Sequence, residues 1–344
     1  MPESFNPAPV SELHNVSPDQ FNTAIRYSAK PVVLRDAVAH WPLVKDRNAK
    51  KMFSRIKGFD TKKLQPTIIG KQGVKGAFHY SSDLKGQNYN QIPETLSAGL
   101  ERLLNAPSKD GTYMQSLSIA DHMPGFLDAH RLDLVPNTVK PRIWIGTPTT
   151  VQTHFDTSEN IACVVLGERE VTLFPPDQLP ALYPGPLESA PGGVMVSLTS
   201  LETPNFDTHP QFKEALKTAQ RTKLSAGDAI YIPYGWWHHI RALSPLNILV
   251  NYWWTDQQAM LQDPYTSMFH AMMCFHHLRP EQAKVWQNMF AHFVFRQNGD
   301  PMEHVPDPAK GILAGVSPKD RERAIYTLVK TLGTNISKPP SAPK

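Results

Sequence analysis

His154 and Asp156 lie two positions apart in the sequence, with Phe155 between them. On an extended strand, residues two apart point to the same side, so the imidazole and the carboxylate can bind one metal ion together. One His and one carboxylate are two of the three ligands in the facial triad that holds non-haem Fe(II), which leaves three coordination positions open. The pair therefore predicts a metal site, with Phe155 pointing to the opposite side.

The third ligand of such a site should come from a strand that folds back beside the first. Two adjacent candidates, His238 and His239, lie much further along the chain. Strand alternation puts His238 in phase with Ile240 and His239 in phase with Arg241, so an apolar interior favours His238 and sends His239 toward the polar outside. The two preceding tryptophans, 236–237, are expected to wall the site. The alternative for His238 is a core histidine satisfied by a backbone carbonyl.

A third feature is Arg169, which is in phase with Val171 and Leu173 on an apolar strand. A buried charge is costly unless it is paired, and no acidic residue shares this face of the strand. A ligand that carries a carboxylate would supply the pair through a bidentate contact. Tyr113 and Asn251 are candidates for further hydrogen bonds to such a ligand, although at strand ends these residue types are commonly structural.

The composition is that of a soluble globular protein, with 344 residues, 40% hydrophobic and 19% charged, and ample chain for a core. A net charge of +4 is mild and does not by itself indicate nucleic acid. The basic stretch 45–63 is either a solvated face or a patch for RNA or an acidic peptide. Two cysteines, Cys163 and Cys274, form no disulfide framework, which favours a reducing cytoplasm. No run approaches the roughly 18 apolar residues of a membrane span, so no membrane anchor is expected.

Short β-branched and aromatic runs broken by Pro and Gly fill residues 142–254 and predict a closed antiparallel barrel or jelly roll. The expected strands are 142–146, 161–166, 170–174, 229–233, 238–243 and 248–254. A long proline-rich excursion at 175–219 is expected to be functional. Before the barrel, the sequence predicts a helix capped by Ser17, strands at 31–35 and 112–116, and a helix at 93–105. After it, apolar residues recur at helical spacing in 286–294, and another helix follows from 317 to about 332.

These features divide the sequence into four expected parts. Residues 1–111 form an N-terminal α/β extension, 112–255 the β-rich core, 256–336 a C-terminal helical segment and 337–344 a disordered tail.

Five motifs in this order resemble the JmjC/cupin-like Fe(II), 2-oxoglutarate-dependent oxygenases, most closely the factor-inhibiting-HIF asparaginyl hydroxylase branch. The motifs are His154 to Asp156, Leu173 to Pro176, Gly227 to Pro233, Gly235 to Ile240 and Val250 to Trp253. The resemblance covers residues 112–254 and, more weakly, 31–38. It implies a mainly β fold with a double-stranded β-helix, that is, a cupin-like jelly roll, between the N-terminal extension and the C-terminal helices.

The resemblance also implies site roles. It makes His154, Asp156 and His238 the ligands of Fe(II) and places Arg169 where the family grips the distal carboxylate of 2-oxoglutarate. Further residues expected to contact 2-oxoglutarate are Tyr113, Asn160 and Asn251.

One position departs from the hydroxylase pattern. Val151 stands where that branch has a threonine, three residues before the first ligand, so a hydroxyl contact is lost. The contact to the cosubstrate carboxylate would then move to Thr150, Thr153 or the larger guanidinium of Arg169.

The implied reaction uses O2 and 2-oxoglutarate and releases succinate and CO2. Hydroxylation of a protein side chain is expected in preference to N-demethylation. A small molecule or tRNA is the alternative substrate, and a non-catalytic cupin-like binding module is the alternative from another class. The resemblance further implies a homodimer formed through the C-terminal helices.

Overall fold

The computed structural model describes residues 5–46, 48–186, 193–255, 264–310 and 318–333. The chain forms two compact units, Met1–Thr255 and Asp256–Lys344. The tail expected at 337–344 lies outside the described residues. The boundary expected at residue 111 stays a prediction; strands from both sides of it belong to the same sheet.

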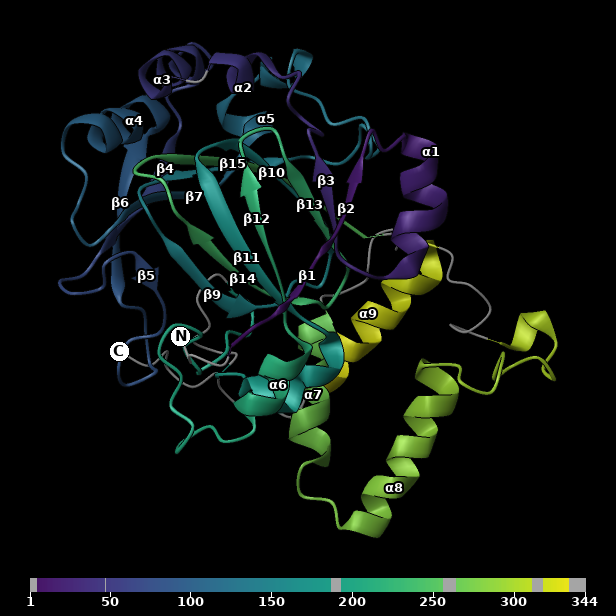
Figure 1. Ribbon diagram of the computed structural model, residues 1–344. Helices are drawn as coiled ribbons and strands as arrows, with labels where there is room; N and C mark the ends of the chain where they lie inside the picture. Colours follow the sequence, from purple (N-terminus) through teal and green to yellow (C-terminus); the bar gives the residue numbers. More distant parts are fainter. Residues whose placement is uncertain (1–4, 47, 187–192, 256–263, 311–317, 334–344) are drawn as a thin grey trace. The chain divides into compact units, whose positions relative to one another are not determined.

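The first unit is built on eight strands divided between two facing sheets (Figure 1). The strands are β8 (Arg142–Gly146), β9 (Thr150–His154), β10 (Glu159–Leu166), β11 (Glu168–Phe174), β12 (Gln220–Ser225), β13 (Ala229–Ile232), β14 (Trp237–Ala242) and β15 (Asn247–Trp254). One sheet contains the order β13-β10-β15-β8 and the other β12-β11-β14-β9, with every neighbouring pair antiparallel. This arrangement of two facing sheets confirms the expected jelly roll. Consecutive strands of the chain lie in different sheets except β11 and β12, which pair within the smaller sheet.

All six expected strands of the barrel are present, whereas β12 was missed. Polar residues fill β12, and only Thr222 and Leu224 on one face are buried. A strand that presents so little apolar surface gives a weak signal in the sequence.

The remaining strands lengthen the two sheets at their edges. They are β1 (Ala8–Pro9), β2 (Ser11–His14), β3 (Val32–Arg35), β4 (Leu64–Gly70), β5 (Ala77–Phe78), β6 (Tyr89–Thr95) and β7 (Thr112–Ser118). The larger sheet has the order β2-β3-β13-β10-β15-β8-β7-β4-β6 and the smaller one β1-β12-β11-β14-β9-β5. Apolar side chains of both sheets, among them Val171, Leu173, Ile230 and Leu249, form the core between them.

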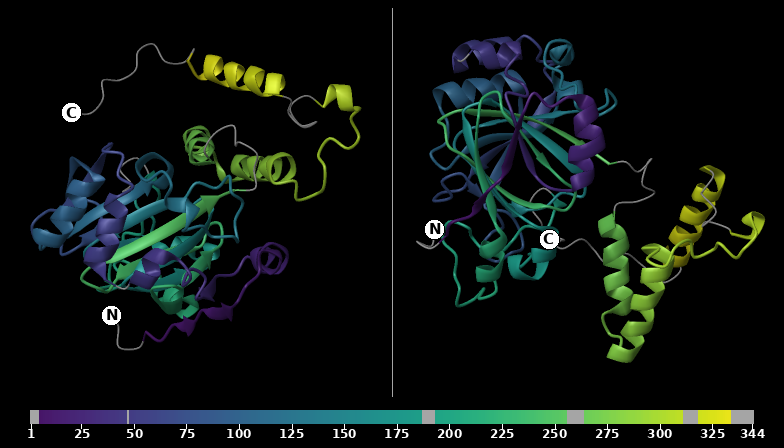
Figure 2. Two further views of the ribbon diagram at one scale, coloured as in Figure 1. Left: turned by 90° about the horizontal axis from the view of Figure 1, so that it is seen from above. Right: turned by 45° about the vertical axis from the view of Figure 1, so that its right-hand side comes forward.

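Helices cover the outer face of the larger sheet (Figure 2). The helical elements of this unit before the barrel are α1 (Pro18–Gln20), the π-helical turn η1 (Phe21–Ile25), η2 (Arg26–Ser28), α2 (Pro42–Asp46), α3 (Ala49–Lys57), α4 (Leu96–Asn105), α5 (Ile119–His122) and η3 (Phe126–Asp128). The Ser17 hydroxyl accepts a hydrogen bond from the Gln20 amide, which confirms the expected cap. The helix expected from 93 begins at Leu96, because residue 93 is a proline paired within β6 and Thr95 provides the cap.

The excursion at 175–219 packs on the outer face of the smaller sheet. It contains η4 (Pro176–Leu182) and α6 (Phe212–Thr218), and its residues 187–192 lie outside the described part. Leu182 and Phe212 join Phe174 and Trp237 in one apolar cluster. The excursion also reaches the end of β9, where Val196 forms a bridge with His154.

The second unit is helical, as expected. Its elements are α7 (Pro264–Phe275), α8 (Pro280–Met289), the π-helical turn η6 (Phe290–Val294), η7 (Asp307–Ala309) and α9 (Pro318–Gly333). The ring of Phe275 contacts those of Trp286 and Phe290, with centroids 4.7 and 5.6 Å away. Within the described parts of the chain, no helix is long and apolar enough to cross a lipid bilayer.

Candidate functional site

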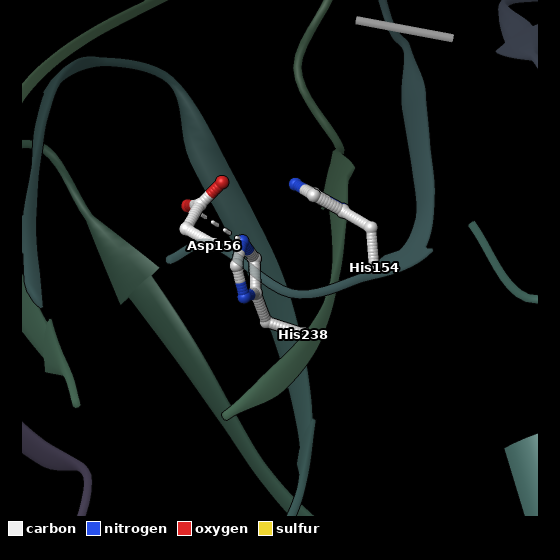
Figure 3. A group of neighbouring side chains, drawn as sticks. All are labelled: His154, Asp156 and His238. Atoms are coloured by element: carbon white, nitrogen blue, oxygen red, sulfur yellow. Dashed lines mark ion pairs between the residues drawn. The ribbon is translucent and has the colours of Figure 1, made fainter. Parts of the chain in front are cut away.

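The site is set by the pairing of β9 with β14. His154 ends β9, and its direct partner across the ladder is His238, the second residue of β14. Asp156 follows two residues after His154, where the chain has left the strand. The three side chains converge (Figure 3), and one potential ligand atom from each lies within 4.8 Å of the other two.

Backbone carbonyls orient both imidazoles. The Nδ1 atom of His154 lies 2.8 Å from the carbonyl of Gln152, and that of His238 lies 3.0 Å from the carbonyl of Trp236. A carbonyl only accepts, so each Nδ1 carries the proton and each Nε2 keeps a free lone pair, as metal-binding histidines require. Burial, together with the neighbouring His154, lowers the pKa of His238 to about 4, which keeps this imidazole neutral near pH 7.

The carboxylate of Asp156 has its own support. The indole Nε1 of Trp253 donates a hydrogen bond of 3.0 Å to Asp156 Oδ2, which lies 3.6 Å from His238 Nε2. Two imidazole nitrogens and one oriented carboxylate form the donor set that a non-haem Fe(II) site uses. The residues present thus fit a divalent metal ion.

Beside the cluster of His154, Asp156 and His238 lies a cavity that ends at Arg169, here called the Arg169 cavity. Its lining residues include His154, His238, Tyr113, Asn160, Arg169 and Asn251. Arg169 is 2% exposed, and its Nε and Nη2 atoms have no hydrogen-bond partner. Tyr113 makes a hydrogen bond to this guanidinium, and burial raises the tyrosine pKa to about 12 while it lowers the pKa of Arg169. A buried guanidinium with free donors fits an anionic ligand that reaches from the metal.

The two asparagines form the opposite part of the lining. Asn251 donates to Asn160 Oδ1 over 3.3 Å and accepts a 2.7 Å hydrogen bond from the Trp144 indole. All the site residues expected from the sequence therefore lie at one place in the structure. Their roles stay predictions.

The position of Val151 follows from an irregularity in β9. The ladder between β9 and β14 shifts register between His238 and Ile240, so Val151 and His154 both line the Arg169 cavity although they lie three positions apart in the sequence. Neither Thr150 nor Thr153 is among the described residues that line it. Of the alternatives to the missing threonine, this geometry favours Arg169.

The expectation that Trp236 and Trp237 wall the site is wrong. Trp236 packs between the sheets and donates to the carbonyl of Ala29, and Trp237 packs against Phe155 on the far side of the smaller sheet. Trp144 and Trp253 line the site instead. Strand alternation carried a signal for Trp253, because it is two residues after Asn251 and therefore on the same side.

His239 points away from the site, as expected, but it is not at the surface. It is 2% exposed, and its Nε2 lies 3.0 Å from a carboxylate oxygen of Glu202 in the excursion. The contact with His239 lowers the pKa of Glu202 to about 2, against the opposing effect of burial. The excursion therefore covers a face that strand alternation alone assigns to solvent.

Comparisons with known proteins agree with the fold. Residues 18–260 match the cupin-like domain family. The chain is 31% identical over 186 residues to the lysine-specific demethylase JMJ31 of Arabidopsis thaliana, covering 54% of this chain and 32% of that protein. It is 24% identical over 260 residues to the Jumonji C domain-containing protein 5 of Drosophila melanogaster, covering 71% of this chain and 59% of that protein. It is 27% identical over 157 residues to the human HSPB1-associated protein 1, covering 44% of this chain and 31% of that protein. The chain spans less than two thirds of the length of each.

We expect His154→Ala, Asp156→Ala and His238→Ala each to weaken Fe(II) or Mn(II) binding by more than about a hundredfold, because loss of an outer-shell partner alone costs 10–100-fold. Titration of the metal, followed by electron paramagnetic resonance or calorimetry, measures the change. His239→Gln is the matched control and should bind metal normally. Loss of metal binding in His239→Gln but not in His238→Ala would show that the strand phase is wrong.

A second prediction concerns the support of Asp156. Trp253→Phe removes the indole donor and should weaken metal binding by about 10–100-fold. Trp254→Phe is the control, since Trp254 contacts Phe21 and Arg26 and does not contact the triad. Equal affinities in the two variants would contradict a supporting role for Trp253.

Proposed function

Since this chain belongs to the cupin-like domain family, we propose that it is an Fe(II)- and 2-oxoglutarate-dependent oxygenase. One observation carries the proposal: the His154, Asp156 and His238 cluster opens into the same cavity as the buried guanidinium of Arg169 with its free donors. The printed names of the relatives, a lysine-specific demethylase and a Jumonji C domain protein, support an oxygenase of this type.

One group of residues would bind the metal and another would bind 2-oxoglutarate. With Fe(II), 2-oxoglutarate and O2 bound, such a site supplies an oxidant for a C–H bond and releases succinate and CO2. His154, Asp156 and His238 hold the metal and leave its other positions open. Arg169 binds the distal carboxylate with both free donors, and the Tyr113 hydroxyl lies beside it. The buried lining excludes water, which strengthens this contact.

We propose a protein side chain as the substrate and hydroxylation as the reaction. The alternative substrate, tRNA, has little support from the basic stretch at 45–63. Five of its basic side chains have acidic partners within the chain: Lys51 and Arg55 with Asp46, Lys57 with Glu101, Lys62 with Asp60, and Lys63 with Asp121. All five charges are thus paired, and three of them, Lys51, Arg55 and Lys57, lie on α3. The narrower likeness to the asparaginyl hydroxylase and the cytoplasmic location stay predictions.

Fe(II)- and ascorbate-stimulated conversion of 2-oxoglutarate to succinate tests the proposal, first without an added substrate and then with a peptide library. Turnover that disappears in Asp156→Ala supports an oxygenase. A protein that binds metal but yields no succinate under either condition is instead the non-catalytic cupin-like module.

We expect Arg169→Ala to raise the KM for 2-oxoglutarate by tens- to thousands-fold, because a desolvated charge-assisted contact contributes roughly 2–5 kcal/mol. Arg169→Lys should lie between, since Lys keeps the charge but loses the planar fork. Initial rates of succinate release across the three proteins measure the change, with metal affinity as the control that stays constant. An unchanged KM in Arg169→Ala would place the distal carboxylate elsewhere.

We also propose that the second unit forms a homodimer. Many of its large apolar side chains are exposed, among them Val285 at 60%, Trp286 at 42% and Val294 at 58%. Exposed apolar surface of this kind marks an interaction site. The alternative is that the same helices cover apolar surface within one chain.

Light scattering on the full chain should give twice the mass of one chain. Trp286→Glu and Val294→Glu should produce monomers, because a charge in an apolar interface is left unpaired. Tyr27→Glu is the control, since Tyr27 is 82% exposed in the first unit. A monomeric unmodified protein would contradict the dimer.

A further inference from the structure

A second chamber meets the Arg169 cavity along the metal ligand His154 and the rings of Tyr113 and Trp144, which line both. Its lining also includes Gln115 and Gln152. Because it touches the metal ligands without reaching Arg169, it is the place from which a second reactant approaches the metal.

The charge of the second chamber restricts that reactant. Among its described lining residues, Asp156 is the only Asp, Glu, Lys or Arg. Its carboxylate accepts from Trp253 and lies beside His238 Nε2, where a bound metal would use its charge. A cationic side chain entering the chamber would therefore lack a counter-charge among these residues.

The aromatic rings do not replace that counter-charge. Tyr113 is stacked with both Phe78 and Trp144, at 6.0 Å between centroids in each case. Tyr89 contacts Phe78 edge to face at 5.6 Å. Binding of a cation by aromatic rings needs ring faces directed at the cation. The faces of Tyr113 are turned toward Phe78 and Trp144, so this ring is not directed at a cation, whereas Tyr89 and Trp253 meet their neighbours edge to face.

Neutral groups, namely hydroxyls such as those of Thr157 and Ser158 and the amides of two glutamines, supply the other polar groups. Gln152 is 9% exposed, and its Oε1 atom has no hydrogen-bond partner. Its backbone carbonyl already orients His154, which fixes the residue beside the metal ligands. Gln115 lines the same chamber and is half-buried. An unpaired amide oxygen in this wall favours a ligand that brings a hydrogen-bond donor without a charge.

We propose that the second chamber receives an uncharged side chain that forms hydrogen bonds, and that Gln152, with Gln115, determines this specificity. The proposal rests on the proposed function, because it takes the metal at His154, Asp156 and His238 as the centre to which the side chain is directed. It supports hydroxylation over N-demethylation, whose methylated amine carries a positive charge at neutral pH.

The full chain loaded with Mn(II) tests this without a known substrate. The ion shortens the proton relaxation times of small molecules held near it, so nuclear magnetic resonance detects even weak binding. Propionamide and propylammonium serve as probes of similar size and different charge. Propionamide should show an Mn(II)-dependent enhancement at least about tenfold larger, since the ammonium loses its hydration without gaining a partner.

Two variants of Gln152 assign the effect to this residue. Gln152→Glu adds a carboxylate to the chamber and should reverse the preference toward propylammonium. Gln152→Met keeps the shape, removes the amide and should reduce the effect on propionamide. Gln91→Glu makes the same charge change at an exposed position of β6 and should leave the preference as it is.

Equal or stronger relaxation of propylammonium in the unmodified protein would overturn the proposal, as would the absence of an effect on either probe. Both results would leave the proposed function standing. Failure to bind Mn(II) at all, measured first by electron paramagnetic resonance, would instead contradict the proposed function and the inference with it.

Discussion

The antiparallel pairing of β9 with β14 is the contact on which the site depends. It places His154 directly opposite His238, although a long excursion and several strands separate the two in the sequence. On its other side β14 pairs with β11, which carries Arg169. One sheet thus provides His154, His238 and the guanidinium, whose spacing follows from the fixed distance between neighbouring strands, and Asp156 follows just after the end of β9.

The larger sheet completes the site from the opposite side. Asn160 on β10 and Asn251 on β15 face the cavity from that sheet, and Trp253 reaches across from β15 to Asp156. A jelly roll supplies this arrangement because consecutive strands alternate between the sheets at every step except from β11 to β12. A shift of one residue in either sheet would turn these side chains to the other face.

The sequence predicted the barrel strands other than β12 and, through strand alternation, the inward phase of His238 and Arg169, whereas Asn160 was expected only from the family resemblance. It did not predict what surrounds them. Whether His239 meets solvent depends on Glu202 in the excursion, and the position of Val151 depends on a register shift in β9. The walls were misassigned for a related reason: Trp236 and Trp237 are adjacent to a ligand along the chain, whereas Trp144 and Trp253 are adjacent to it in space.

Whether a buried polar atom without a hydrogen-bond partner indicates a ligand depends on where the atom lies. Buried atoms without partners also occur on Thr149, Thr199 and Tyr252, none of which lines a site cavity, so such an atom alone indicates no ligand. Arg169 and Gln152 differ because each lines a cavity that also touches a metal ligand. A carboxylate at the first and a neutral donor at the second would satisfy both groups, and a ligand that binds only the folded chain stabilises it. Leaving these two groups unpaired costs free energy in the folded chain, and ligand binding would recover that free energy. Their burial is therefore consistent with a stable jelly roll.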